Sequence, residues 1–185
     1  KAFRHIYVVG AGKAGGLMAA ALESILEDCL TGGVVNVKYG HAVPVHRVEL
    51  IEAGHPIPDN AGVQGAERIV RLLESLDEED LVFCVLSGGG SALMPLPVAG
   101  ITLEEKQAVT GLMMDCGVTI NEINTVRKHI SQMKGGHLAQ LASPATVISL
   151  ILSDVIGDPL DVIASGPTVP DPSTFADCRA IMTRC

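Results

Sequence analysis

Apolar segments as long as a β-strand alternate with segments of helical periodicity along this chain. Five apolar segments are expected to form strands; they cover residues 5–10, 34–40, 47–55, 81–86 and 146–154. Between several of them, apolar residues recur at the three- and four-residue spacing of a helix, as they do over residues 13–29. Strands that alternate with helices are typical of a parallel sheet with helices on both faces, so the sequence predicts the α/β class.

Two of the apolar segments are expected to lie deep in the sheet. Residues 81–86 (LVFCVL) show no polar alternation, which indicates a central strand covered on both faces. Residues 146–154 are the most apolar segment and are expected to form the most buried strand. Two helix starts are also predicted, from the capping-box pattern Thr102–Glu105 and from Asp59 or Asn60.

Composition and charge exclude several classes of function. Hydrophobic residues make up 48% of the 185, enough for the core of one domain, or of a domain and part of another. The net charge of −8 argues against a nucleic-acid or anionic-membrane partner, and no apolar stretch reaches the roughly 20 residues that span a bilayer. The five cysteines are scattered without a Cys-x-x-Cys pair, which indicates a reducing compartment rather than a disulfide framework or a zinc site.

The two ends of the sequence indicate a part of a longer protein. The chain begins Lys-Ala-Phe, without Met or a signal sequence, and enters a strand within a few residues. It stops at Cys185, inside a segment of helical pattern. We therefore expect residues 1–185 to be one domain, truncated at both ends, of a larger protein.

A glycine-rich motif follows the first predicted strand. Gly10, Gly12 and Gly15 satisfy Gly-x-Gly-x-x-Gly, and Lys13 lies between them. The match to a dinucleotide-binding motif is weak, because the end of the second strand, Lys38–Gly40, lacks the acid that binds a ribose. A helix N-terminus beside a lysine nevertheless favours a phosphate or carboxylate, which makes Gly10 and Gly12 candidate nucleotide-binding residues. The alternative is a tight strand–helix turn with a solvated lysine.

A second glycine-rich loop follows the strand at residues 81–86. Consecutive glycines allow backbone N–H groups to converge on an anion, and the flanking serines add hydroxyl groups. The alternative, a flexible crossover, is disfavoured because the loop directly follows a buried strand. The candidate nucleotide-binding residues of this loop are Ser87, Gly88, Gly89, Gly90 and Ser91.

Polar side chains also lie after the third and fifth predicted strands. Asp154 ends the strand at residues 146–154, and Asp158 follows it. A carboxylate at a strand end can orient a hydroxyl nucleophile, hold Mg²⁺, or do both, so these two are candidate metal ligands. Ordinary turn chemistry is the alternative, and it is favoured for Asp161. His55 is a candidate substrate-binding residue after the third strand, with a turn residue as the alternative.

Three cations fall within eight residues of this acidic chain: Arg127, Lys128 and Lys134. They are candidates for binding an anionic substrate, with a solvated helix face as the alternative. Residues 119–142 are expected to form two helices that break at Gly135–Gly136, and the second helix could bind another anion at its start.

Five segments of the chain, taken in order, resemble one enzyme family. They read VVGAGKAGGLMAAALE, EAGHPIPDNAG, LSGGGSAL, NTVRKHISQMKGGHLA and SDVIGDPLDVIASGPTVPDPSTF. Over nearly its whole length the chain resembles the type-II D-glycerate kinases (the MOFRL-associated glycerate 2-kinases), and the animal members most closely. The resemblance implies a three-layer Rossmann-like domain with a mostly parallel sheet. In the family a second α/β domain follows and supplies an arginine to the active site; residues 1–185 do not include it.

The resemblance also implies an activity. Enzymes of this family use ATP and Mg²⁺ to phosphorylate D-glycerate to 2-phosphoglycerate. By motif, the family's active-site lysine falls on Lys13, its strand-end aspartate on Asp154 and its nucleotide loop on Ser87–Ser91. Any of the three clustered cations could bind the substrate carboxylate. We expect the protein in the cytoplasm or the mitochondrion, without membrane or nucleic-acid partners, as a monomer or a homo-oligomer.

Two other functions stay open on the residues alone. An NAD(P)-dependent oxidoreductase would use the first glycine motif, but the missing ribose-binding acid disfavours it. A non-catalytic module that binds a sugar phosphate or a nucleotide would need the glycine loops but not Asp154. Binding measurements with ATP, NADH and glycerate distinguish the three functions.

Overall fold

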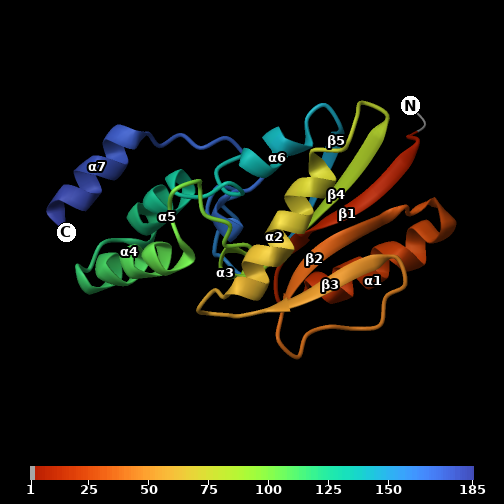
Figure 1. Ribbon diagram of the computed structural model, residues 1–185, viewed down its shortest axis with the longest axis horizontal. Helices are drawn as coiled ribbons and strands as arrows, with labels where there is room; N and C mark the ends of the chain where they lie inside the picture. The colour runs from red at the N-terminus through yellow and green to blue at the C-terminus, as the bar shows by residue number, and fades with distance from the viewer. Residues whose placement is uncertain (1–2) are drawn as a thin grey trace.

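The computed structural model describes residues 3–185, and a sheet of five strands forms its centre (Figure 1). Every pair of neighbouring strands is parallel, and their order across the sheet is β3-β2-β1-β4-β5. The strands are β1 (His5–Ala11), β2 (Gly32–Lys38), β3 (Val48–Ala53), β4 (Asp80–Ser87) and β5 (Thr146–Leu152). The predicted α/β class with a mostly parallel sheet is confirmed.

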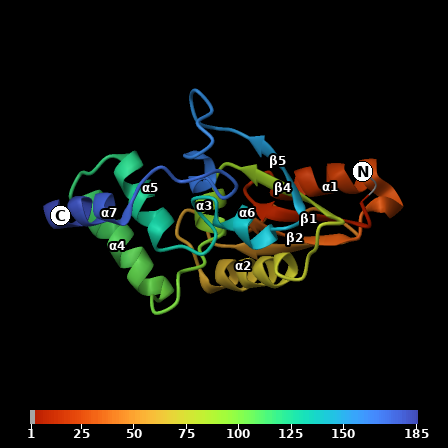
Figure 2. The ribbon, with the colours of Figure 1, turned by 90° about the horizontal axis from the view of Figure 1, so that it is seen from above.

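Helices lie on both faces of the sheet (Figure 2). α1 covers one face, and α2 and α6 cover the other, which gives three layers. The helices are α1 (Gly15–Leu26), α2 (Asn60–Leu73), α3 (Gly90–Leu93), α4 (Leu103–Asp115), α5 (Ile120–His129), α6 (His137–Ala142) and α7 (Phe175–Arg184), with short 3-10 turns η1 (Glu27–Cys29) and η2 (Ile163–Ser165). No helix within residues 3–185 is long and apolar enough to cross a membrane.

Alternate residues of the central strands build two apolar clusters. In β1, Val8 packs toward α1 and Val9 toward α2, and both are fully buried. In β4, Cys84 and Val85 divide between the two faces in the same way. Burying one such aliphatic side chain stabilises the fold by about 1.5–3 kcal/mol. The prediction that residues 81–86 form a central strand covered on both faces is confirmed.

The prediction that residues 146–154 form the most buried strand is wrong. β5 is an edge strand, and its residues alternate between exposed and half-buried. Val147 and Ile151 pack against the cluster under α2 and α6, whereas Ile148, Leu150 and Leu152 are 42%, 36% and 58% exposed. The apolar composition of a strand does not reveal whether a helix covers it, and α1 lies over β1, β2 and β4 instead.

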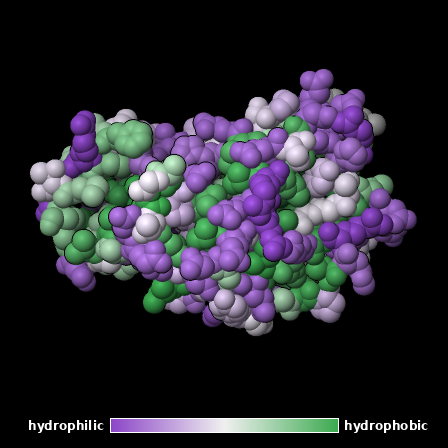
Figure 3. Space-filling model, in the orientation of Figure 1, coloured by the Kyte–Doolittle hydropathy of each residue, from purple (hydrophilic) through white to green (hydrophobic). Residues whose placement is uncertain are grey.

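A group of helices, α4, α5 and α7, lies beyond the carboxyl ends of the strands (Figure 1). Its small core contains Met113, Val126 and Ile181. Figure 3 shows apolar surface gathered over this group, where the exposed side chains are Leu112, Met114, Ile120, Phe175 and Met182. The group therefore forms a lobe that stands apart from the three layers.

Local capping patterns set several helix starts. The predicted capping box of α4 is present, with the Glu105 N–H donating to Thr102 Oγ1 at 3.1 Å. Asp59 caps α2 by accepting the Gly62 N–H at 3.0 Å. The two helices predicted within residues 119–142 both form, but the first already ends at His129, well before the glycine pair.

Candidate functional site

The two glycine-rich loops meet at the carboxyl edge of the sheet, because they follow the adjacent strands β1 and β4. The Lys13 N–H donates to Gly88 O at 2.9 Å, and the Ala14 N–H donates to Ser87 Oγ at 3.0 Å. Ligands of open α/β sheets bind at this edge, where the chain departs to opposite faces of the sheet.

The first loop uses its own N–H groups within the protein. Besides the two bonds just described, the Gly12 N–H donates to Asn36 O at 3.1 Å and the Gly15 N–H to Gly12 O at 3.0 Å. Gly10 and Gly12 have φ angles of +147° and +151°, and a β-carbon on either would collide with β4. These glycines therefore allow close packing of two strand ends, and the N–H groups of residues 12–15 are not available to a phosphate.

The second loop, Ser87–Ser91, is different; we call it the glycine loop. Within residues 3–185, no acceptor takes the N–H groups of Gly88, Gly89, Gly90 or Ser91. They border a cavity of about 210 Å³, which we call the loop cavity and which Asp154 and Arg127 also line. Unpaired N–H groups converging on a hollow are what binds an anion in a backbone nest.

Asp154 and His55 both lie against this loop. A β-carbon at Gly88 would collide with the Asp154 carboxylate, and one at Gly89 would lie 2.8 Å from His55 Nε2. Burial lowers the pKa of His55, and the positive charge of Lys13 lowers it further, while Asp154 acts in the opposite direction. The sequence-predicted Lys13, His55 and Asp154 are thus brought together with the glycine loop.

The hydroxyl groups that flank the loop are engaged with the protein. Ser87 is buried and its Oγ accepts the N–H of Ala14. Ser91 Oγ lies 2.9 Å from Ser165 Oγ, which in turn donates to Asn124 Oδ1 at 3.2 Å. These contacts hold the loop in place, and within residues 3–185 the backbone N–H groups of Gly88 to Ser91 are left without an acceptor.

Lys134 is fully buried and supports the glycine loop from behind. Its Nζ donates to Ser91 O at 2.8 Å and to Met94 O at 3.1 Å. These carbonyl groups end the short helix α3, which also receives a hydrogen bond from Asn36 Nδ2 to Leu93 O at 2.7 Å. Burial places the pKa of Lys134 well below its usual range. It holds the loop in place from behind and is not among the residues that line the loop cavity.

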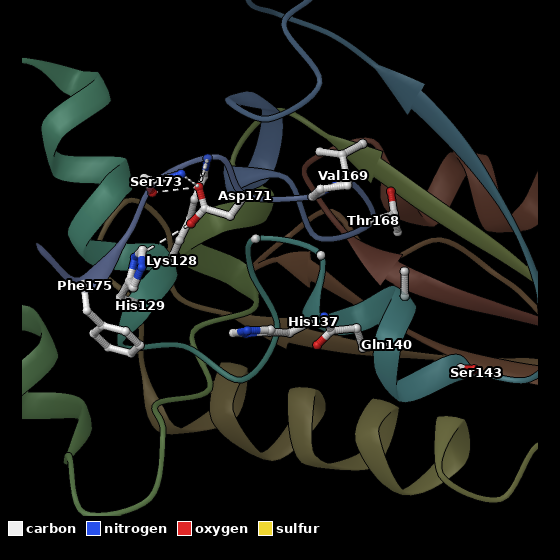
Figure 4. Close-up of a pocket in the computed structure, with 14 residues that line it drawn as sticks. Lys128, His129, His137, Gln140, Ser143, Thr168, Val169, Asp171, Ser173 and Phe175 are labelled. Carbon is white, nitrogen blue, oxygen red and sulfur yellow. Dashed lines mark hydrogen bonds and ion pairs between the residues drawn. The ribbon is translucent and has the colours of Figure 1, made fainter. Parts of the chain in front are cut away.

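Lys128 faces a different cavity, of about 660 Å³, between α5, α6 and residues 168–175 (Figure 4). Its Nζ lies 3.4 Å from an Asp171 oxygen and 3.6 Å from an Asp161 oxygen. Figure 4 shows Lys128 beside Asp171 on one wall of that cavity, and Asp171 also accepts a hydrogen bond from Ser173 Oγ at 2.7 Å. Lys128 is therefore paired with two carboxylates and does not lie at the glycine loop.

The glycine pair before α6 does not form an anion site. The Gly135 N–H donates to Ser165 O at 3.0 Å and the Gly136 N–H to Gly166 O at 2.8 Å. The expected second anion-binding helix is therefore not found, because its first N–H groups pair with the segment after β5.

Arg127 is the member of the cation cluster that reaches the site. It lines the loop cavity and also a neighbouring cavity of about 570 Å³, which we call the cationic cavity. Within residues 3–185 its guanidinium has no hydrogen-bond or ion-pair partner, and burial lowers its pKa. His55 and Gly89 line the cationic cavity as well.

Lys106, which the sequence analysis missed, also lines the cationic cavity. It is buried, and its Nζ donates to Ile130 O at 3.1 Å. Its position in the sequence could have indicated this, because Lys106 lies three residues after the apolar Leu103. That spacing places both residues on the buried face of α4. The sequence also did not identify Asn36, a polar residue in the middle of β2 whose side chain donates to Leu93 O and so helps to hold α3 in place.

The carboxylates after β5 are accessible. Asp154 and Asp158 are both exposed, and Asp158 lies in a turn with a φ of +50°. In the part of the chain that the structure describes, no three His, Cys, Asp or Glu side chains gather as metal ligands. A Mg²⁺ ion here would need further oxygen ligands from a bound phosphate, as Mg²⁺ in nucleotide sites commonly has.

The fold and its two adjoining cavities define an α/β domain with a loop of unpaired N–H groups at the carboxyl edge of the sheet. The chain belongs to the family described as "Domain of unknown function (DUF4147)", which it matches over residues 1–185.

Relatives of this chain include proteins named glycerate kinase, from animals and from other organisms, so the resemblance to that family is confirmed. The chain is 50% identical to "Glycerate 2-kinase" of Pyrococcus horikoshii over 177 residues, which cover 96% of this chain and 40% of that protein. It is 46% identical to "Glycerate kinase" of Homo sapiens over 195 residues, 98% of this chain and 37% of that one. It is also 50% identical over 177 residues to an Agrobacterium vitis protein named "Putative hydroxypyruvate reductase", covering 96% of this chain and 40% of that protein.

A solved structure shares the fold. The crystal structure of glycerate kinase from Thermotoga maritima superposes with a TM-score of 0.94 at 46% identity, covering 97% of this chain and 44% of that chain. This chain therefore spans only 37–44% of the length of these related proteins.

Proposed function

We propose that the protein to which this chain belongs transfers the γ-phosphate of ATP to D-glycerate and forms 2-phosphoglycerate. One observation carries the proposal. Four unpaired N–H groups, on Gly88 to Ser91, border a cavity that the Asp154 carboxylate also lines. Phosphoryl transfer requires a protein to position the phosphates, to neutralise their charge and to orient the attacking hydroxyl. The names of the kinase relatives support this reaction.

Each group of the site has a role in this reaction. The glycine loop binds the nucleotide phosphates through its backbone, and Lys13 neutralises charge on the transferred phosphate. A glycerate hydroxyl attacks the γ-phosphorus, the bond from that phosphorus to the bridging oxygen breaks, and ADP leaves. Asp154 orients the hydroxyl and takes up its proton. Half-buried His55, kept neutral by burial and by Lys13, is available to hydrogen-bond the acceptor.

Arg127 binds the glycerate carboxylate in this proposal. Of the three clustered cations, it is the one that lines the cavities and has no partner within residues 3–185. Lys128 is paired with carboxylates, and Lys134 is held by backbone carbonyls. A guanidinium presents two parallel N–H groups to a carboxylate, which fixes the orientation of the substrate.

The proposal places Mg²⁺ at the carboxylates after β5, of which Asp154 lines the loop cavity. Asp154, with Asp158 a few residues further on, would hold the ion together with phosphate oxygens of the nucleotide. When bound, the ion neutralises charge that the phosphates carry and develop.

We further propose that residues 1–185 form the N-terminal nucleotide- and substrate-binding domain, and that a second domain covers the site. The chain spans 40% of the Pyrococcus horikoshii relative, which leaves more than half of such a protein for that role. Lys13 and Asp154 are both exposed in this chain, and phosphoryl transfer to a hydroxyl needs water to be excluded.

A reductase is the second candidate, since one relative is named for that activity. The structure offers little support for a bound dinucleotide, because the N–H groups of the first glycine loop are paired within the protein. β2 ends at Lys38 rather than at an acid that would bind a ribose. A non-catalytic nucleotide-binding module is the third candidate, and it would not need the carboxylate of Asp154.

One set of assays on the complete protein distinguishes these functions. The protein is incubated with ATP, Mg²⁺ and D-glycerate and, in parallel, with NADH or NADPH and hydroxypyruvate. ³¹P NMR identifies the product, because a phosphate on C2 couples to one proton and a phosphate on C3 to two. Oxidation of NAD(P)H without phosphate transfer would overturn the kinase proposal, and ATP binding without turnover would support the binding module.

A further inference from the structure

The cationic cavity contains positive charge without a carboxylate to balance it. Lys106, Arg127 and His55 are the charged or titratable side chains among its lining residues, and no Asp or Glu of residues 3–185 lines it. The other lining residues, among them Gly89, Gln107 and Met114, are uncharged. A protein with a net charge of −8 has many acidic residues, so their absence here is informative.

The cations in and behind this cavity come from two helices and a loop. Lys106 lies on α4 and Arg127 on α5, while Lys134, in the loop before α6, is buried behind the glycine loop. In the part of the chain that the structure describes, Lys106 and Lys134 donate to backbone carbonyls alone, which are neutral. Burying like charges near one another without an anion costs free energy, and the protein relieves it by favouring their neutral forms.

The pKa of Lys106 reflects this unfavourable burial of positive charge. Burial lowers its pKa to about 7, and the charge of Arg127 contributes in the same direction. His55, which also lines the cavity, has a lowered pKa and brings no negative charge. At neutral pH, Lys106 is therefore poised between its charged and neutral forms.

We propose that Lys106 and Arg127 together bind the carboxylate of the acceptor acid, and that Lys106 takes up a proton as that acid binds. The inference rests on the proposed kinase function and extends it, since it names the residues that select an acidic acceptor. A carboxylate between the two cations supplies the missing negative charge and favours the charged form of Lys106. The ordinary hydrogen bond from Lys106 to Ile130 holds the side chain at the cavity wall in both forms.

A carboxylate explains this cavity better than the nucleotide phosphates do. All four residues with unpaired N–H groups, Gly88 to Ser91, line the loop cavity beside Asp154, whereas two of the four also line the cationic cavity. Arg127, Gly89 and Ser91 line both cavities, so a small acid in one can reach a phosphate in the other. Lys106 lines the cationic cavity but not the loop cavity.

The first test measures KM and kcat of the complete enzyme with a matched set of variants. Lys106→Met removes the charge at similar size, and we expect KM for D-glycerate to rise about 10–100-fold, the usual effect of losing one charged hydrogen bond. KM for ATP should stay within about threefold of its original value. Lys106→Arg should restore most of the glycerate affinity. Lys128→Met is the control, because Lys128 is as buried as Lys106 (5% and 4% exposed) but faces the other cavity.

The second test uses pH, which a purely structural lysine would not affect in this way. In the unmodified enzyme, KM for D-glycerate should rise by up to tenfold per unit above pH 7, as Lys106 loses its proton. In Lys106→Arg the KM should be flat up to pH 9, because a guanidinium stays charged. Calorimetric titration with D-glycerate at pH 8, in two buffers of different ionisation enthalpy, should show uptake of up to about one proton.

These measurements separate failure of the inference from failure of the kinase proposal. If the enzyme phosphorylates glycerate but Lys106→Met leaves KM for glycerate and its pH dependence unchanged, the inference is wrong. If the protein is not a kinase yet binds glycerate with proton uptake that Lys106→Met abolishes, the inference stands without the kinase. If inorganic phosphate binds at Lys106 more tightly than glycerate does, the cavity is a phosphate site and the carboxylate assignment fails.

Discussion

His55 lies directly against the α-carbon of Gly89: a β-carbon at that position would be 2.8 Å from both Nε2 and Cδ2 of the imidazole. The contact joins the segment after β3 to the glycine loop after β4. Gly89 also has a φ of +86°, which side chains with a β-carbon rarely adopt. The shape of the glycine loop and the place of the candidate substrate residue therefore depend on each other.

Gly89→Ala is expected to weaken ATP binding at least tenfold in the complete protein. The β-carbon displaces His55 and shifts the N–H groups that border the loop cavity. Calorimetric titration with ATP measures the change. Gly100→Ala is the matched control, because Gly100 has a φ of +85° but a β-carbon there would meet no atom of residues 3–185 within 4 Å, so this variant adds the backbone strain without the collision. Equal ATP affinity in both variants would show that the glycine loop does not bind the nucleotide.

Lys13→Ala is expected to lower kcat by about 10²–10³-fold, the usual effect of removing one preorganised group that stabilises developing charge. KM for D-glycerate should change by less than about threefold, since the carboxylate is bound elsewhere. Steady-state kinetics on the complete protein measure both constants. Lys38→Ala is the control. The charge of Lys38 also lowers the pKa of His55, but this lysine lies at the end of β2 and outside the first glycine loop. A kcat within threefold of the original would show that Lys13 is a solvated turn residue and does not take part in the reaction.

Asp154→Asn is expected to lower kcat by about 10²–10⁴-fold, the range that a general base contributes. The amide keeps the shape of the side chain against Gly88 but cannot take up the hydroxyl proton. ATP affinity should fall by less, because the backbone of the glycine loop remains. Asp161→Asn provides the comparison, since Asp161 pairs with Lys128 instead. Similar rates for Asp154→Asn and the original enzyme would contradict the assigned role.

The stability of the protein is expected to rise with pH between about 7 and 10 through Lys106. The folded-state pKa of this lysine is about 7, against an ordinary value of 10.5, so in that interval the unfolded chain binds a proton that the folded protein does not. The free energy of unfolding therefore increases with pH, by up to about 1.4 kcal/mol per unit. Urea denaturation at pH 7 and pH 9 measures it. Subtracting the same difference for Lys106→Met isolates this lysine, and a remainder of zero would mean that Lys106 is protonated in the folded protein.

A protein limited to residues 1–185 is expected not to phosphorylate glycerate. Lys13 and Asp154 are exposed in it, and water would compete with the acceptor for the phosphate. The exposed apolar face of β5 should also make it aggregate more readily than the complete protein does. The kinase assay with ATP, Mg²⁺ and D-glycerate, together with light scattering, tests both statements. Turnover near that of the complete protein would show that no second domain is needed to close the site.

The sequence alone was sufficient for the class of fold and for the position of the glycine loops. Both follow from interactions between residues close along the chain. The alternation of apolar and helical segments defines the α/β class, and Thr102 caps its helix from three residues away. A loop that directly follows a strand lies at the edge of the sheet wherever that strand pairs, so the glycine loop and Asp154 were correctly placed near strand ends.

The tertiary structure decided which of these residues are free to act. The N–H groups of the first glycine loop pair with partners such as Asn36 and Gly88, and Lys134 pairs with Ser91, all distant in sequence. The same holds for β5, whose apolar residues were expected to be buried until its edge position was known. Whether a polar group is available to a ligand depends on every group that folding brings near it, and local sequence patterns do not contain that information.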